Sequence, residues 1–155
     1  MSEVPISEDA QNQQGGFTVR RRLPTTAERV YAAFVEPAKL EQWFVVPGYR
    51  TPADRMRVDA RPGGRVDAVM IAELDGSEIP FGFEYGDLAP AHLVTLRFDQ
   101  PRELVMVTLT GGGANGVDLA YEFVSWPAPK DAAASRRGVE DMLDRIEDGI
   151  RRGTI

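Results

Sequence analysis

The chain has 155 residues, contains no cysteine and one histidine, and carries a formal net charge of −6. This composition excludes disulfides, cysteine-based zinc and iron–sulfur sites, thiol nucleophiles and histidine clusters, and a Ser-His-Asp triad could use only His92. The negative charge argues against a nucleic-acid binder whose affinity comes from neutralising phosphates. We therefore expect one domain without metal or cofactor.

The first 16 residues are polar and acidic, follow no hydrophobic pattern and end in a pair of glycines. They predict a disordered leader over 1–16, followed by a single domain over 17–152. The sequence holds no run of 18 apolar residues, and its N-terminus lacks the charged-then-apolar pattern of a signal peptide. We expect a cytoplasmic protein without a membrane span.

A short strand and two short helices are predicted at the start of the domain. Phe17–Leu23 alternates as a strand does. Thr25 as N-cap and Glu28 three residues later fit a capping box for the first helix. Pro37 suits the first turn of the second helix, which presents two aromatic side chains on one side.

Between about residues 55 and 125 the hydrophobic period changes from that of a helix to that of strands. Turn signals rich in glycine and proline divide this stretch into short segments, which is typical of an antiparallel meander. The predicted strands are Arg55–Arg61, Arg65–Leu74, Ile79–Leu88, Leu93–Phe98, Glu103–Thr110 and Val117–Ser125.

The longest helical segment is predicted at the C-terminus, over about 132–151. Its apolar stripe consists of Val139, Met142, Leu143, Ile146 and Ile150. Seven antiparallel strands have one apolar face to bury, and this amphipathic helix is the obvious cover. The residues thus predict an α+β fold with the sheet packed against the C-terminal helix.

The hairpin between the first two strands of the meander predicts its own register. With Asp59 opposite Arg65 and Arg57 opposite Asp67, opposite charges face each other across the strands. A shift of two residues would instead set Asp59 against Asp67, which is unfavourable. Cross-strand ion pairs also explain Arg61 and Arg65 better than an anion site does.

Three further features have structural explanations. His92 follows a proline turn, where a solvated side chain is expected. Gly111–Gly113 is interpreted as a hairpin loop, because a phosphate loop would need a helix after it. Arg20–Arg22 is a charge run that would protect an edge strand from aggregation.

Several motifs are distributed from the first helix to the last. They are TTAERVYAAF at 25–34, Trp43-Phe44, DARPGGR at 59–65, Asp75-Gly76, Gly82, Leu88-Ala89-Pro90 with Leu93-Val94, and GVEDMLDR at 138–145. Together they resemble the bacterial branch of the family homologous to the activator of the heat-shock-protein-90 ATPase, within the START-like (SRPBCC) superfamily. The resemblance covers about residues 17–150.

This resemblance implies a helix-grip fold, as in the birch-pollen allergen. A curved seven-stranded antiparallel sheet would wrap the long C-terminal helix, with two short helices after strand 1 and a hydrophobic cavity between sheet and helix. Two positions depart from the family pattern: Val139 stands where an aromatic residue often follows the glycine, and Phe44 where a second tryptophan is frequent. The valine would either enlarge the cavity or only change its shape.

Aromatic and methionine side chains suit the wall of such a cavity, because aromatic rings offer flat stacking area and methionines adapt to irregular guests. Each could equally pack as ordinary core. The candidate wall residues are Phe34, Trp43, Phe44, Met70, Phe81, Phe83, Phe98, Met106, Tyr121, Met142 and Ile146.

We expect a binding protein, a monomer or weak homodimer, that encloses a hydrophobic or aromatic small molecule such as a lipid, polyketide or other natural product. The resemblance also implies a role in natural-product self-resistance, a form of antibiotic resistance. The alternative is an enzyme of the polyketide aromatase/cyclase type, with Tyr85, Tyr121, Arg61 and Glu84 as the residues to test. A chaperone co-activator is disfavoured, because the partner-binding N-terminal region of the eukaryotic activator is not seen.

Overall fold

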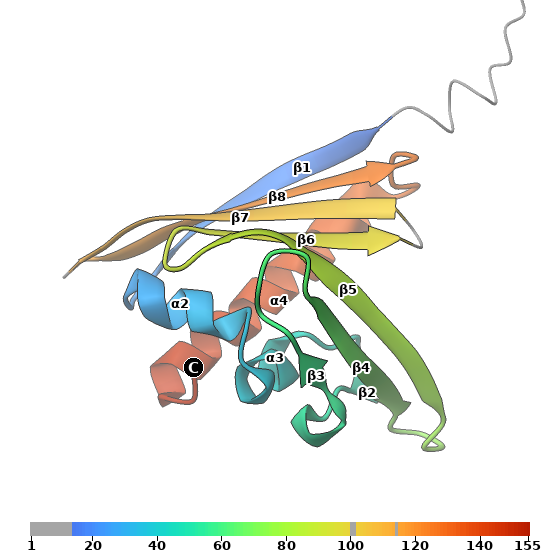
Figure 1. Cartoon of the computed structure of the whole chain (residues 1–155). Coiled ribbons are helices and arrows are strands. Elements are labelled where there is room, and N and C mark those ends of the chain that lie inside the picture. The colour runs from blue at the N-terminus through green and yellow to red at the C-terminus, as the bar shows by residue number, and fades with distance from the viewer. Residues whose placement is uncertain (1–13, 100–101, 114) are drawn as a thin grey trace, which may run out of the picture.

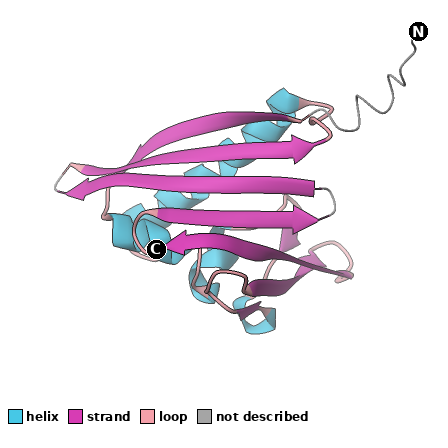
Figure 2. Ribbon diagram, turned by 45° about the horizontal axis from the view of Figure 1, so that its top comes forward, coloured by secondary structure: helices cyan, strands magenta, loops and turns pink. Residues whose placement is uncertain are grey.

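The computed structural model describes residues 14–99, 102–113 and 115–155. One antiparallel sheet of eight strands has the helices of these ranges on one of its faces (Figures 1 and 2). In chain order the elements are β1 (Gly15–Leu23), α2 (Ala27–Ala33), α3 (Pro37–Trp43), β2 (Tyr49–Arg50), a 3-10 turn η1 (Ala53–Arg55), β3 (Arg57–Val58), β4 (Arg65–Ala72), β5 (Glu78–Ala89), β6 (Leu93–Asp99), β7 (Arg102–Gly113), β8 (Gly116–Trp126) and α4 (Ala132–Arg152).

The strand order in the sheet is β1-β8-β7-β6-β5-β4-β2, with β3 also paired to β4. Strands β4 to β8 therefore form the predicted meander, and β1 joins it at β8 as an edge strand. This confirms the α+β helix-grip fold, with the sheet curving around α4 (Figure 1). The eighth strand, β2, was not predicted, because a two-residue pairing leaves no periodicity in the sequence.

The predicted leader lies outside the described residues except for 14–16. Within those, β1 begins at Gly15, two residues before the predicted start at Phe17. None of the helices in the described ranges is long and apolar enough to cross a membrane.

The N-cap of α2 is Thr26, one residue later than predicted. Its hydroxyl oxygen accepts a hydrogen bond of 3.3 Å from the backbone N–H of Arg29. Glu28 therefore lies in the first turn, one position too early to close a capping box on this threonine. Two adjacent threonines offer the same cap chemistry, so the sequence did not distinguish them.

The predicted strand Arg55–Arg61 is largely replaced by turns. Within this segment, β3 is the part that forms a strand, paired with β4. The turn η1 precedes it, and after it the backbone turns back, where the backbone N–H of Arg61 donates to the carbonyl oxygen of Asp59 at 2.9 Å. The register is confirmed: Arg57 lies opposite Asp67.

The ion pairs of this hairpin join residues two apart in the sequence, which corrects the expectation of cross-strand pairs. Arg61 contacts Asp59 at 2.8 Å, and Arg65 contacts Asp67 at 3.6 Å. Arg65 and Asp67 share a face of β4, because residues two apart on a strand do, whereas Asp59 and Arg61 lie in the turn after β3. Neither pair therefore needs a residue of the partner strand. All four side chains are exposed, and the pairs contribute little to stability.

The glycine run is part of a strand rather than a loop. Gly111 and Gly113 lie in β7, with a register shift between them, and β8 begins at Gly116. Gly111 has a φ of +88°, which a residue with a side chain rarely adopts. His92 is exposed in the turn before β6, where its backbone N–H donates to the carbonyl oxygen of Ala89 at 2.8 Å.

Helix α4 packs its predicted stripe against the inner face of the sheet. Its buried members are Val139, Leu143, Ile146 and Ile150, and Gly149 is buried with them. The helix starts at Asp131, whose carboxylate accepts from the N–H of Ala134 at 3.0 Å. It is tied to β1 by an ion pair of 2.5 Å between Arg21 and Asp144.

Candidate functional site

An apolar cavity of about 400 Å³ lies between the N-terminal half of α4, the segment after α3, and the inner face of β6, β7 and β8. We call it the inner cavity. Its walls also carry three charged side chains, Glu103, Asp141 and Arg145, and the serine hydroxyl of Ser135. The other lining residues are Phe44, Val45, Val46, Pro47, Phe98, Val105, Tyr121, Phe123, Gly138, Val139 and Met142.

Strand alternation and helix spacing position this wall. Val105 of β7 and Tyr121 of β8 are buried on the face that looks toward α4. Val139 and Met142, three residues apart on α4, close the cavity from the opposite side. Gly138 leaves room beside them, because a Cβ atom there would have no neighbour within 4 Å.

Phe44 joins the inner cavity to an aromatic cluster in the core. Its ring centroid lies 5.4 Å from those of Trp43, Phe81 and Phe83, and 6.5 Å from that of Phe98. Rings at such distances stabilise one another beyond the area they bury. The cluster therefore gives the cavity a rigid aromatic end.

Four of the eleven predicted wall residues line the inner cavity: Phe44, Phe98, Tyr121 and Met142. The others in the core pack behind the wall. Phe34, Trp43, Phe83 and Ile146 are fully buried, and Phe81 and Met70 are half-buried on the inner side of the sheet away from the cavity.

Met106 is placed wrongly by the sequence prediction. It is 37% exposed, whereas its neighbours Val105 and Val107 are buried. Successive side chains of a strand point to opposite faces, so Met106 lies on the outer face of the sheet, away from α4. The prediction followed the residue type and missed the alternation of β7.

Tyr85, the first candidate for acid–base chemistry, is a buried structural residue. Its hydroxyl donates a 2.7 Å hydrogen bond to the carbonyl oxygen of Phe34, the C-cap of α2. Burial raises the pKa of the Tyr85 phenol well above its usual range. Trp43 makes a similar hydrogen bond to the end of α2: its indole N–H donates to the carbonyl oxygen of Ala33 at 2.7 Å.

The other three candidates divide between surface and cavity. Arg61 is exposed in its turn, and Glu84 forms an ion pair of 3.6 Å with Arg97, so neither lines the inner cavity. Tyr121 does line it, and burial, followed by the charge of Glu103, raises the pKa of its phenol. Tyr121 therefore stays protonated near neutral pH and can donate a hydrogen bond.

Glu103 is the charged residue of the cavity wall on the sheet side, and it was not among the candidate residues of the sequence analysis. It is half-buried on the inner face of β7, and burial raises the pKa of its carboxyl group. The alternation of side chains along β7 could have identified it, because Glu103 and Val105 are two residues apart and therefore lie on the same face of the strand. From the sequence alone, Glu103 had no expected role beyond beginning the predicted strand Glu103–Thr110.

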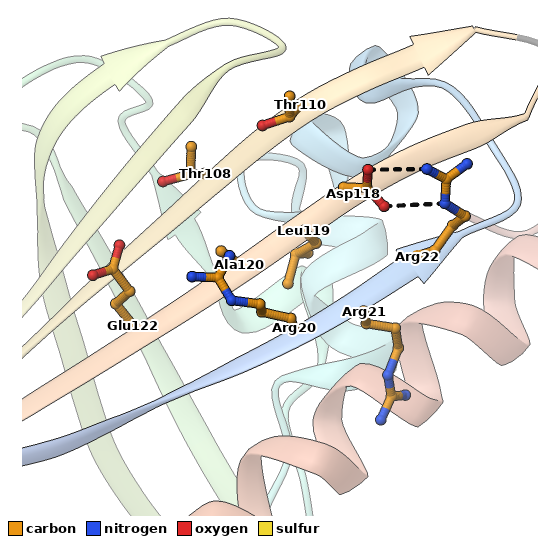
Figure 3. A pocket seen from close by; sticks show the side chains of 9 residues that line it. All are labelled: Arg20, Arg21, Arg22, Thr108, Thr110, Asp118, Leu119, Ala120 and Glu122. Atoms are coloured by element: carbon orange, nitrogen blue, oxygen red, sulfur yellow. Dashed lines mark hydrogen bonds and ion pairs between the residues drawn. The ribbon is translucent and has the colours of Figure 1, made fainter.

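A second hollow, of about 610 Å³, lies on the outer face over β1, β7 and β8 (Figure 3). Arg22 binds the carboxylate of Asp118 there through two hydrogen bonds of 3.0 Å, and Arg21 points to the other side of the sheet, toward α4. This outer hollow is larger, but its lining is polar and charged. The inner cavity has the chemistry that an apolar guest needs.

A curved antiparallel sheet that holds a long C-terminal helix, with an apolar cavity between them, defines the START-like helix-grip class of proteins. The profile of the family described as "Activator of Hsp90 ATPase homolog 1-like protein" matches residues 24–150. The chain belongs to this family. A search of curated proteins finds no match.

Solved structures agree with this assignment. A protein from Chromobacterium violaceum is 26% identical, with a TM-score of 0.71 over 86% of this chain and 95% of its own. An AHSA1-like protein from Aeromonas hydrophila is 17% identical, with a TM-score of 0.77 over 91% and 96%. A protein of unknown function from Staphylococcus aureus is 16% identical, with a TM-score of 0.77 over 93% and 98%. The last two support the fold alone.

Proposed function

We propose that the protein binds a small hydrophobic or aromatic molecule in the inner cavity. The START-like fold commonly binds hydrophobic ligands. A volume of about 400 Å³ lies within the range of small-molecule sites, which are mostly apolar with a few polar groups. The observation that carries the proposal is that Phe44, Val139 and Met142, from two different parts of the chain, all line this space.

The two departures from the family pattern support the same site. Phe44 and Val139 both line the inner cavity, one on the segment after α3 and the other on α4. Each is smaller than the aromatic residue frequent at its position. Space that larger side chains would fill is thereby left to a guest.

The ligand class we propose is a lipid, polyketide or other natural product, because an apolar wall gains about 25 cal/mol for each Å² of apolar surface removed from water. In the cell, we propose that binding of such a product serves self-resistance against it. The supports of this proposal are the cavity and the family fold.

The neutral fluorescent probe N-phenyl-1-naphthylamine tests the proposal. Its emission should rise saturably with the wild-type protein, and Val139→Phe should abolish the rise by filling the cavity. Met106→Phe, which adds the same ring on the outer face, is the matched control and should bind as the wild type does. Binding unaffected by Val139→Phe would contradict the proposal.

A binder and an enzyme are distinguished by the fate of the ligand. Native mass spectrometry of the purified protein identifies any co-purifying molecule, and that molecule should be released chemically unchanged. Conversion of it by the protein, lost in Tyr121→Phe, would support the aromatase/cyclase alternative, since Tyr121 is the one candidate of that set that lines the inner cavity.

A further inference from the structure

Glu103 places a carboxylate on the sheet side of the inner cavity. It lies directly opposite Phe98 of β6 and Ser125 of β8. The neighbouring wall residues on this side, Phe123 and Val105, are apolar. A carboxylate in such surroundings loses part of its hydration, which is unfavourable unless a partner replaces the water.

No such partner is supplied by the described part of the chain, in which the Glu103 carboxylate has neither a hydrogen bond nor an ion pair. Ser125, the nearest hydroxyl across the strand, donates instead to the carbonyl oxygen of Pro127 at 2.9 Å. Arg102, the preceding residue, lies over the ring of Trp126 at 4.6 Å.

The cations around Glu103 are also engaged elsewhere. Arg97 of β6 forms its ion pair with Glu84. Arg145, the cation of α4 that lines the inner cavity, donates to the carbonyl oxygen of Val45 at 3.4 Å and also borders a separate hollow at the C-terminal half of the helix. Because Asp141 adds a second carboxylate to the wall, the inner cavity has a net negative lining.

We infer that the inner cavity selects a ligand with an apolar body and a cationic amine, whose ammonium N–H groups donate to the Glu103 carboxylate. The apolar body packs against Phe44, Val139 and Met142, and the charge reaches β7. The inference rests on the proposed function, because it names the ligand class of the same site. Tyr121, which lines the same cavity, can orient a further polar atom of the ligand.

Three compounds with the same ring system test the charge preference: 1-naphthylmethylamine, 1-naphthalenemethanol and 1-naphthoic acid. We expect calorimetric titration at pH 7 to show the amine binding the wild-type protein about ten-fold more tightly than the alcohol, and the acid most weakly. Glu103→Gln should reduce the amine to the affinity of the alcohol and leave the alcohol unchanged. Glu122→Gln, which removes a carboxylate from the outer face of β8, should change neither.

The outcomes separate this inference from the proposed function. Equal binding of amine and alcohol to the wild type, or tightest binding of the acid, overturns the charge preference and leaves an apolar site. Failure of all three compounds to bind contradicts the proposed function and the inference with it. The wild-type series alone decides the preference, so the test does not depend on the folding of a variant.

Discussion

The hydroxyl of Tyr85 on β5 donates a 2.7 Å hydrogen bond to the carbonyl oxygen of Phe34, the C-cap of α2. Both side chains are almost fully buried, at 0% and 1% exposure. The last carbonyls of a helix need partners that the helix itself does not supply. The bond therefore anchors the end of α2 to the sheet, and the Tyr85 hydroxyl has a structural role.

Tyr85→Phe should therefore destabilise the protein without affecting the inner cavity. The lost bond leaves a buried carbonyl oxygen without its partner, which costs about 1–3 kcal/mol. Denaturant unfolding measures the loss, and titration with a cavity ligand should give an unchanged affinity. Tyr49→Phe is the control, since the structure shows no hydrogen bond from the Tyr49 hydroxyl among the described residues. A Tyr85→Phe variant as stable as the wild type would remove the structural role.

Substitution by alanine is expected to have opposite effects on stability at two glycines of α4. Gly138→Ala should stabilise the protein by up to about 1 kcal/mol, because alanine favours the helix and its Cβ would have no neighbour within 4 Å. Gly149→Ala should destabilise it, because the added Cβ would lie 2.7 Å from Cδ1 of Ile155. Thermal unfolding of both variants checks the sign, and stabilisation by both would contradict the packing of Ile155.

Ile155, which follows the end of α4, is expected to stabilise that helix by packing against it. It is 1% exposed, packs on Gly149, and its carbonyl oxygen accepts from the guanidinium of Arg29 at 2.5 Å. Ile155→Ala should cost about 2 kcal/mol or more of unfolding free energy. In the Ile155→Ala background, Gly149→Ala should lose its destabilising effect. Additive effects of the two changes would show that the two residues are not in contact.

The fold could be predicted from the sequence because helices and strands leave a periodic pattern of apolar residues. The site could not be predicted in the same way, because it depends on single residues. The stripe of α4 and the register of Arg57 against Asp67 followed from spacing and charge. Met106 was misjudged because residue type was weighed above strand parity, and Glu103 was left out although it shares the parity of Val105. The bond of Tyr85 to a backbone carbonyl joins positions 51 apart, and no pattern in the sequence records it.

Glu103 predicts a pH dependence of stability. Burial raises the pKa of its carboxyl in the folded protein above the ordinary value, so the folded state holds this proton more tightly than the unfolded state does. The associated stability is present below the unfolded pKa and is lost as the pH rises through the folded pKa. Glu103→Gln should thus gain stability relative to the wild type between about pH 4 and pH 7.

Denaturant unfolding at both pH values checks this gain, with Glu122→Gln as the control for loss of an exposed carboxylate from the neighbouring strand. Tyr121 also lines the cavity, but its raised pKa keeps it neutral throughout this range. A stability difference between Glu103→Gln and the wild type that does not change with pH would contradict the burial of the Glu103 carboxyl.

Occupation of the inner cavity by a small molecule is tested most directly by methyl spectra of methionine-labelled protein. The Met142 methyl group lines the inner cavity and that of Met106 lies on the outer face, so one spectrum holds both probe and control. Addition of 1-naphthalenemethanol should shift the Met142 resonance saturably and leave the Met106 resonance in place. A Met142 resonance that does not move at saturating ligand, or one that moves no more than Met106, would contradict the account.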